Sequence, residues 1–215
     1  MPRRLNGSRF VQAHTLRLLL YIGAGLIIGA TAALAVFPAA RERLLPRAGM
    51  KVMGQALVGG PFTLTDHTGK RVSDKDFRGR YMLVFFGFTF CPDVCPSTLQ
   101  VTTAALNKLG SKADNFVPIF ITVDPERDGP KELASYVQSF STRLVGLTGT
   151  PEEIAAVAKA YRVYFRKAND PKSTAGYTID HTSLVYVMGP DGAYRTHFAH
   201  TTNADVMAER LAALL

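Results

Sequence analysis

A run of large apolar residues that ends at two cysteines constrains the fold of this chain more than any other stretch. Seven of the eight residues over 81–88 are aromatic or aliphatic, and Gly87 is the one interruption. Such a run is typical of a strand that is buried on both faces. Cys91 and Cys95 follow almost at once, each with a proline directly after it, and they are the only cysteines among the 215 residues. The fold must therefore place both thiols at the end of a buried strand.

The rest of the chain after this stretch alternates between strand and helix patterns. Widely spaced apolar residues up to a glycine at position 110 predict a helix over about 96–109. The other predicted elements are a hairpin over 62–72, strands over 117–123 and 144–147, helices over 130–140 and 151–161, strands over 183–188 and 193–198, and a last helix over 203–214. This order predicts an α/β fold with a central mixed sheet and helices on both faces. It fits a thioredoxin-like fold, which we expect for residues 59–215.

The amino-terminal part of the chain has a different character. Residues 18–37 contain no charged side chain and match the roughly 20 residues that a helix needs to cross a bilayer core. Four arginines and no acidic residue precede them, which by the positive-inside tendency places residues 1–17 in the cytoplasm. We expect a transmembrane anchor over 18–37 and a tether over 38–58. A cleaved signal peptide is the alternative, because Ala33-Leu34-Ala35 could serve as a cleavage site.

The net charge of +8 is concentrated around that apolar segment. Residues 1–58 contain eight Lys or Arg and one acidic residue, Glu42, whereas residues 59–215 contain seventeen basic and sixteen acidic residues. A nearly neutral globular part argues against a nucleic-acid partner, and the basic excess beside an apolar segment indicates a membrane surface. The short segment before the predicted anchor favours a bacterial inner membrane, with the domain in the periplasm, over a mitochondrial inner membrane.

The spacing of the two cysteines leaves two kinds of chemistry open. Residues four apart on a helix lie on one face with Cα atoms roughly 6 Å apart, within the range that a disulfide spans. The same sulfurs, when reduced, can converge on one soft metal ion. A helix N-terminus lowers the pKa of a thiol, which favours the thiolate that attacks disulfides and binds metals. An inert disulfide is the weakest interpretation, since a bond across one turn removes little entropy from the unfolded chain.

Two thiolates leave a metal short of ligands, so a third donor has to come from elsewhere in the chain. The chain has five histidines. His14 precedes the apolar segment and His67 lies in a predicted turn, where both are expected to be solvated. His197 and His200 lie near a strand end, where a surface role is expected. His181 directly precedes a predicted buried strand, in a loop that an α/β sheet could place beside the cysteine turn.

Three motifs, in this order, resemble the signatures of the SCO/SenC family. They are Gly87-Phe88-Thr89-Phe90-Cys91-Pro92-Asp93-Val94-Cys95-Pro96, Val123-Asp124-Pro125-Glu126-Arg127-Asp128, and Asp180-His181-Thr182-Ser183 followed by Pro190-Asp191-Gly192. The resemblance covers about residues 55–215, and an anchor is also typical of the family. Two positions depart from the family pattern. Phe90 stands where many relatives have a histidine or another polar residue, and Gly129 where a threonine is usual.

The resemblance implies a membrane-anchored, thioredoxin-like copper chaperone that delivers copper to the copper site of cytochrome c oxidase. It implies that Cys91, Cys95 and His181 are the copper ligands. Two thiolates and an imidazole suit Cu(I) and can also hold Cu(II), and no fourth ligand of the kind that a structural zinc site uses is evident. Asp124 matches a family position that tunes the site, although capping of its loop is an equal alternative.

The implied partners are the copper-bearing subunit of cytochrome c oxidase, other copper chaperones and thiol reductants. The alternative function is that of a thiol:disulfide oxidoreductase that reduces the cysteines of the oxidase copper site, with Cys91 and Cys95 as the redox pair. The C-x-x-x-C spacing argues against a general oxidoreductase of this fold, because thioredoxins have C-x-x-C. One dithiol could serve both activities.

Overall fold

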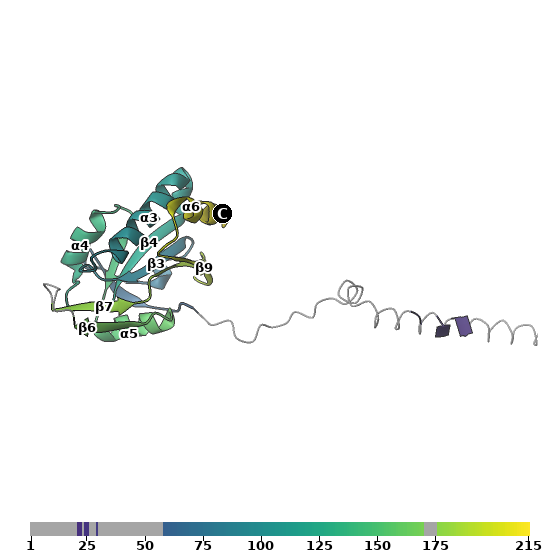
Figure 1. Cartoon of the computed structure of the whole chain (residues 1–215), viewed down its shortest axis with the longest axis horizontal. Coiled ribbons are helices and arrows are strands. Elements are labelled where there is room, and N and C mark those ends of the chain that lie inside the picture. The colour runs from purple at the N-terminus through teal and green to yellow at the C-terminus, as the bar shows by residue number, and fades with distance from the viewer. Residues whose placement is uncertain (1–20, 23, 26–28, 30–57, 170–175) are drawn as a thin grey trace, which may run out of the picture. The chain divides into compact units, whose positions relative to one another are not determined.

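The computed structural model describes residues 21, 22, 24, 25, 29, 58–169 and 176–215. The described residues from 58 onward belong to one compact unit (Figure 1). Residues 21, 22, 24, 25 and 29 are helical, and the rest of the predicted anchor lies outside the described residues. Among the described residues, no helix combines the length and the apolar content needed to cross a membrane. The anchor and the segment boundaries therefore stay predictions.

Within the described residues, a seven-stranded mixed sheet forms the centre of the compact unit. Its strands are β1 (Thr63–Asp66), β2 (Arg71–Ser73), β3 (Tyr81–Gly87), β4 (Phe116–Thr122), β5 (Val145–Thr148), β8 (Leu184–Met188) and β9 (Tyr194–Ala199). Their order across the sheet is β2-β1-β5-β4-β3-β8-β9. Strand β4 runs parallel to both β3 and β5, and the other neighbours are antiparallel. The predicted central mixed sheet is confirmed, with the apolar run before the cysteines on the inner strand β3.

Helices cover both faces of this sheet, as predicted. The helices are α3 (Val94–Leu109), α4 (Pro130–Gln138), α5 (Pro151–Ala160) and α6 (Ala204–Ala212), with short 3-10 helices η1 (Asp74–Phe77) and η2 (Gly110–Asn115). Phe85 and Phe86 are neighbours on β3, so their side chains point to opposite faces. On the Phe85 face, the Phe120 ring packs 5.3 Å from that of Tyr136 on α4. On the other face, Phe86 packs 5.4 Å from Tyr161, directly after α5. Figure 1 shows α3 and α6 side by side, with α5 across the sheet.

The predicted start of the helix after residue 150 is confirmed atom by atom. The hydroxyl of Thr150 accepts a hydrogen bond from the backbone N–H of Glu153 at 3.2 Å, and the backbone N–H of Thr150 donates to the Glu153 carboxylate at 2.9 Å. These reciprocal bonds satisfy two backbone donors at the end of a helix, and Pro151 needs no such partner. The capping pattern therefore predicted the start of this helix correctly.

A two-stranded hairpin between α5 and β8 was not predicted. It consists of β6 (Phe165–Asn169) and β7 (Tyr177–His181), which form a sheet of their own among the described residues. The pairing is antiparallel and places Phe165 opposite His181. The prediction that His181 lies in a loop is wrong, because His181 is the last residue of β7. The alternation of side chains along β7 therefore sets the face to which His181 points.

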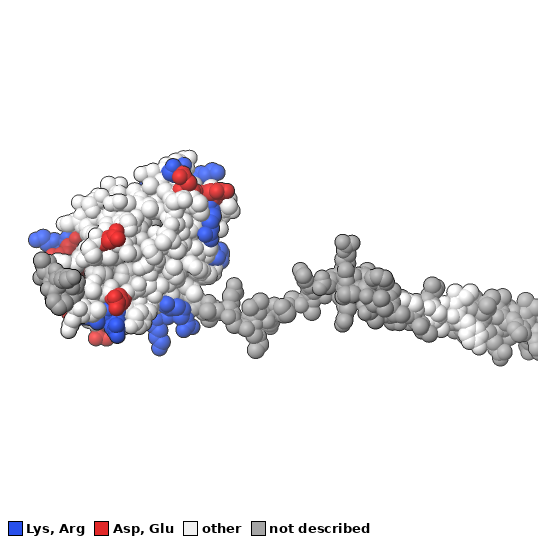
Figure 2. Space-filling view, in the orientation of Figure 1, with Lys and Arg blue, Asp and Glu red and all other residues white. Residues whose placement is uncertain are grey.

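The described charges of the compact unit are mixed in sign. On the face drawn in Figure 2, Lys and Arg side chains form small separate groups around the edge, and Asp and Glu side chains lie among them. Several of these charges are paired, as in the ion pairs of Lys108 with Asp205 and of Arg195 with Asp191. Pairs of this kind leave little net field over the surface.

Candidate metal centre

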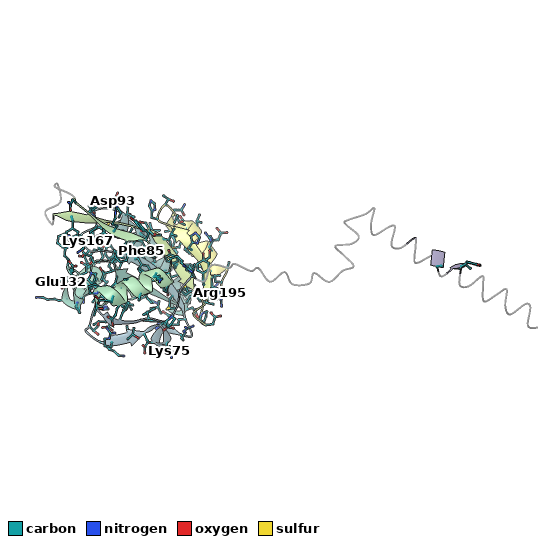
Figure 3. The ribbon with its side chains drawn as sticks, turned by 90° about the horizontal axis from the view of Figure 1, so that it is seen from below. Lys75, Phe85, Asp93, Glu132, Lys167 and Arg195 are labelled. Atoms are coloured by element: carbon teal, nitrogen blue, oxygen red, sulfur yellow. The ribbon has the colours of Figure 1, made fainter. Side chains whose placement is uncertain are left out.

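The three predicted ligands lie together at one end of the sheet. Cys91 is in the turn after β3, Cys95 is the second residue of α3, and His181 ends β7. Their ligand atoms all lie within 4.8 Å of one another, and the Sγ atom of Cys95 is 3.5 Å from the Nε2 atom of His181. Both cysteines are free thiols. In Figure 3, Asp93 of the cysteine turn and Lys167 of β6 lie at the same end of the domain, and Arg195 lies at the other.

Cys91 and Cys95 do not share a helix face, in contrast to the geometry assumed from their spacing. Helix α3 begins at Val94, so Cys91 lies before the helix. Its backbone N–H donates to the carbonyl of Phe88 at 3.2 Å, which closes the turn. The Sγ atom of Cys91 accepts a hydrogen bond from the backbone N–H of Cys95 at 3.3 Å. N–H groups in the first turn of a helix have no partner within that helix. The two sulfurs therefore converge because the Sγ atom of Cys91 accepts one of these N–H groups from α3, the helix that carries Cys95.

Gly87 makes room for the buried sulfur of Cys95. A Cβ atom at position 87 would lie 2.8 Å from the Sγ atom of Cys95 and 2.8 Å from the Phe120 ring. Cβ atoms in proteins essentially never lie within 3.0 Å of a non-bonded atom, so no larger residue fits without a shift in the site. The sequence showed the signal, since a glycine inside a buried strand often marks a close approach. Its role at the site was not predicted.

The ring of His181 is oriented by its surroundings. Its Nδ1 atom is 3.2 Å from the carbonyl oxygen of Thr182, so a proton on Nδ1 donates to that carbonyl. This leaves the lone pair of Nε2 directed toward the cysteines, the arrangement that metal-binding histidines use. The rings of Phe85 and Phe88 pack edge to face against the imidazole, with centroids at 6.2 and 5.8 Å. The imidazole is thus held between two aromatic rings and a backbone carbonyl, with its Nε2 atom beside the cysteine sulfurs.

The two thiols differ in acidity. A hydrogen bond from Cys95 is the main cause that lowers the pKa of Cys91 to about 4, against the opposing effect of burial, and His181 lowers it further. The pKa of Cys95 is raised, because this thiol gives its hydrogen bond to Cys91 and is itself buried. Near neutral pH the pair therefore holds one thiolate and one thiol. A metal ion that binds both sulfurs must release the proton of Cys95.

Buried carboxylates tie the cysteine turn to the loop after β4. Asp128 accepts hydrogen bonds from the backbone N–H of Thr89 at 2.9 Å, from its hydroxyl at 2.5 Å, and from the hydroxyl of Thr122 at 2.6 Å. Burial raises the pKa of the Asp128 carboxyl. Asp124 is 1% exposed, forms an ion pair with Arg127 and accepts a hydrogen bond from the hydroxyl of Tyr177 at 3.0 Å. Neither carboxylate belongs to the ligand group; both hold the segments around it.

The other described histidines have different surroundings. His67 is half-buried, and its Nδ1 atom accepts a hydrogen bond from the backbone N–H of Gly146 at 3.2 Å, so the expectation that it is only solvated is wrong. His197 is exposed and lies 2.5 Å from the hydroxyl of Tyr194, and His200 is also exposed. His14 lies outside the described residues.

The donor set decides which metals fit. Thiolates are soft ligands and an imidazole suits copper, so two sulfurs and one nitrogen match Cu(I) and tolerate Cu(II). A structural zinc site has four protein ligands, and the group found among the described residues has three. The fold and the site together define a class of protein, an α/β domain of thioredoxin type with a Cys-Cys-His metal group at the end of its central strand.

Comparison with known proteins gives the family. The SCO1/SenC family model matches residues 51–215, and the chain belongs to this family. It is similar to the human mitochondrial SCO1 homolog, with 44% identity over 163 residues that cover 74% of this chain and 54% of the relative. The mouse mitochondrial SCO1 homolog is 40% identical over 206 residues, which cover 94% of this chain and 70% of the relative. The match thus spans about half of the human relative's length.

Two of the solved structures that resemble this chain were determined with copper bound. The structure of Bradyrhizobium japonicum ScoI with copper bound is 45% identical, has a TM-score of 0.68, and the match covers 74% of this chain and 99% of that one. Yeast Sco1 with copper bound is 35% identical, has a TM-score of 0.67, and the match covers 73% of this chain and 87% of that one. The predicted family and the thioredoxin-like α/β fold are confirmed.

Proposed function

We propose that this chain is a membrane-anchored copper metallochaperone that delivers copper to the copper site of cytochrome c oxidase. The observation that carries the proposal is the convergence of Cys91, Cys95 and His181, whose ligand atoms lie within 4.8 Å of one another. This donor set suits copper, and relatives of the same fold were solved with copper bound. Copper is the cargo of this reaction.

The site supports transfer by ligand exchange. Cys91 is half-buried and Cys95 is fully buried, so an incoming ligand from a partner reaches the copper from the Cys91 side. Cys91 already provides a thiolate, and Cys95 gives up its proton as copper enters. His181 supplies the third donor from a separate element of the fold. The partner's own thiolates then replace these ligands one at a time.

The location of the protein is part of the same proposal. The predicted anchor over 18–37 and the arginines before it support a domain on the outer side of a membrane. A bacterial inner membrane with the domain in the periplasm is favoured, with the mitochondrial inner membrane as the alternative. The relatives include mitochondrial SCO1 homologs and the ScoI of Bradyrhizobium japonicum.

Copper titration of the reduced full chain tests the proposal. We expect one Cu(I) per chain, and a stoichiometry near zero would contradict it. Removal of a group that only hydrogen-bonds to a ligand costs roughly 10- to 100-fold in metal affinity. The variant His181→Ala removes a ligand itself and should therefore lose more copper affinity than that. It should still form the Cys91–Cys95 disulfide under oxidation. The matched control is His197→Ala, since His197 is an exposed histidine of β9 outside the ligand group.

A second candidate function is reduction of the cysteines at the oxidase copper site. It is favoured by one specific observation: the half-buried Cys91, whose pKa is lowered by the hydrogen bond from Cys95, lies next to the buried Cys95. Cys91 would attack the substrate disulfide, and Cys95 would then displace the substrate thiol, so that two electrons pass to the substrate and a Cys91–Cys95 disulfide forms. Copper-free chain should reduce a disulfide-bonded substrate in this case, and Cys95→Ser should trap the mixed disulfide. Absence of any reduction would remove this second function.

A further inference from the structure

The histidine ligand is carried by an element outside the main sheet. Among the described residues, β6 and β7 pair only with each other, and β8 joins the main sheet three residues after His181. The cysteines, in contrast, follow the central strand directly. Something must therefore hold the β6–β7 hairpin at the distance that lets His181 meet the cysteines.

Four side chains form an alternating stack of rings and cations beside the metal-ligand group. The guanidinium carbon of Arg127 lies 4.9 Å from the ring centroid of Phe90 and 3.8 Å from that of Tyr177. The ammonium of Lys167 lies 4.8 Å from the ring centroid of Tyr177. The order is thus Phe90, Arg127, Tyr177, Lys167. A cation and the face of an aromatic ring attract each other electrostatically, and the attraction is strongest where water is excluded.

The stack joins the segments that carry the ligands. Phe90 precedes Cys91 in the cysteine turn, and Arg127 lies in the loop after β4. Tyr177 begins β7 and Lys167 lies in the middle of β6. The stack therefore runs from the residue next to one ligand to the strand that ends at another.

Arg127 is held firmly in the middle of the stack. It forms an ion pair with Asp124, and the same carboxylate accepts the hydroxyl hydrogen bond of Tyr177 at 3.0 Å. Its Nη1 atom donates to the backbone carbonyl of Tyr177 at 3.4 Å. The Nη2 atom of Arg127 is buried, and none of the described residues provides it with a hydrogen-bond partner. A buried unpaired donor costs free energy, so hydrogen bonding alone does not explain the place of this guanidinium.

Strand geometry links Tyr177 to His181. Side chains alternate along a strand, so residues four apart point to the same face. Tyr177, Ile179 and His181 therefore share one face of β7, and Ile179 in the middle is 4% exposed. A contact that fixes Tyr177 against the loop after β4 thus also fixes the direction of His181.

We propose that Arg127 is a positioning residue, which acts through the stack with Phe90 and Tyr177 to hold His181 against the cysteine pair. The copper readout of this inference rests on the proposed function. The positioning itself does not, because it concerns contacts among the chain's own residues. Loss of the stack leaves both sulfurs in place and loosens the strand that carries the histidine.

The decisive comparison is between Tyr177→Leu, which removes the ring, and Tyr177→Phe, which keeps it. Amide hydrogen exchange of the metal-free, reduced full chain is measured over residues 177–182. We expect exchange about tenfold faster in Tyr177→Leu and close to the unaltered chain in Tyr177→Phe. The matched control is Tyr194→Leu, since Tyr194 packs on His197 of β9 away from the stack. Equal exchange in Tyr177→Leu and the unaltered chain would overturn the proposal.

Copper affinity gives the second readout, in a double-mutant cycle with His181→Ala. We expect Tyr177→Leu to weaken copper binding roughly 10- to 100-fold in the unaltered background and to have no effect when His181 is already alanine. An equal loss in both backgrounds would overturn the positioning role. If the unaltered chain binds no copper, the proposed function fails while the exchange experiment still decides the inference.

A variant at the exposed end of the stack guards against loss of folding. Phe90 is 54% exposed, so Phe90→Leu removes a ring without opening the core. We expect faster exchange over 177–182 in the same direction as for Tyr177→Leu, but smaller. Arg127→Lys keeps a cation but loses the planar group that lies over the rings of Phe90 and Tyr177. Exchange over 177–182 should be at least as fast in this variant as in Phe90→Leu. Unchanged exchange in both variants would contradict the proposal.

Discussion

The two parts of the chain that build the metal-ligand group differ in how they are held. The cysteine arm, which we define as β3, residues 88–93 and α3, is built on the core, since every residue of β3 after Tyr81 is buried and so is Cys95. The histidine arm, defined as β6, β7 and Thr182, has a single buried residue in its strands, Ile179. Packing in the core holds the strand that leads to the cysteines. The hairpin that carries His181 is held mainly by contacts of individual side chains outside the core.

This difference places the three ligands of the proposed copper site on two kinds of structure. Two sulfurs on a packed core keep a constant spacing, because close-packed interiors resist deformation. A third ligand on a peripheral hairpin can change its distance without disturbing that core. We therefore expect loss of a cysteine ligand to abolish the site, and changes in the contacts that hold the histidine arm to weaken it.

The largest effect is expected from Cys91→Ser. A hydroxyl is a hard, weak ligand for copper, and the buried Cys95 would lose the thiolate that accepts its hydrogen bond. Copper binding at one equivalent should fall below detection, as measured by titration of the reduced full chain. Binding that survives at near-normal affinity would break the distinction between the two arms, because it would place the essential ligands elsewhere.

We expect the low pKa of Cys91 to depend on the cysteine arm more than on the histidine arm. The pKa of Cys91 is lowered from 9.0 to about 4. The hydrogen bond from Cys95 is the largest cause, and His181 contributes less. The thiolate is therefore present from about pH 4 upward and is lost as the pH falls below that value. The alkylation rate of Cys91, followed by mass spectrometry, should be nearly constant between about pH 5.5 and 8, where an ordinary thiol gains about tenfold per pH unit.

The same alkylation profile in His181→Ala sharpens the comparison. Since Cys95 is the first cause of the low pKa, the profile should remain nearly flat without the histidine. A rate that rises through the whole range, with a midpoint near that of a free thiol, would show that the histidine arm controls the thiolate.

Gly87→Ala tests the rigidity of the cysteine arm. The added Cβ atom would lie 2.8 Å from both the Sγ atom of Cys95 and the Phe120 ring, so the strand or the sulfur must move. We expect a loss of about 1–3 kcal/mol in the free energy of unfolding, as for other overpacked cores, together with weaker copper binding. The control is Gly60→Ala, where the nearest atom to a new Cβ lies at 3.4 Å. Equal stability of the two variants would contradict the packing argument.

The fold of the cysteine arm could be predicted, because its strand is a continuous apolar run and its helix has clear stop signals. The main sheet and the helices followed from similar patterns. The hairpin of the histidine arm could not, since Arg166, Lys167 and Asp180 are exposed and leave too few buried residues for a strand pattern. The third ligand followed from the resemblance to the family, and topology alone left it open.

Contacts within the site could not be predicted from the sequence either. Cation–π contacts such as that of Arg127 with Tyr177 join residues 50 positions apart, and no local pattern predicts them. The sulfur contact of Gly87 depends on how α3 approaches β3. The start of α3 three residues after Cys91, which changes the geometry of the pair, lies within the usual error of helix boundaries.

The smallest effect is expected from Glu126→Gln in the surroundings of the histidine arm. Glu126 forms an exposed ion pair with Lys167, and exposed pairs contribute on the order of 0–1 kcal/mol. Thermal unfolding should be unchanged within error, and copper affinity should change less than about twofold, since Lys167 still lies over the Tyr177 ring. A loss as large as that of Tyr177→Leu would mean that charge pairing, not stacking, positions the hairpin.

X-ray absorption at the copper edge of the Cu(I)-loaded full chain tests the central claim most directly. The account predicts a first shell of two sulfur atoms and one nitrogen atom, with the outer-shell scattering of an imidazole ring, and loss of that nitrogen in His181→Ala. A first shell of sulfur alone in the unaltered chain, or an unchanged nitrogen signal in His181→Ala, would contradict it.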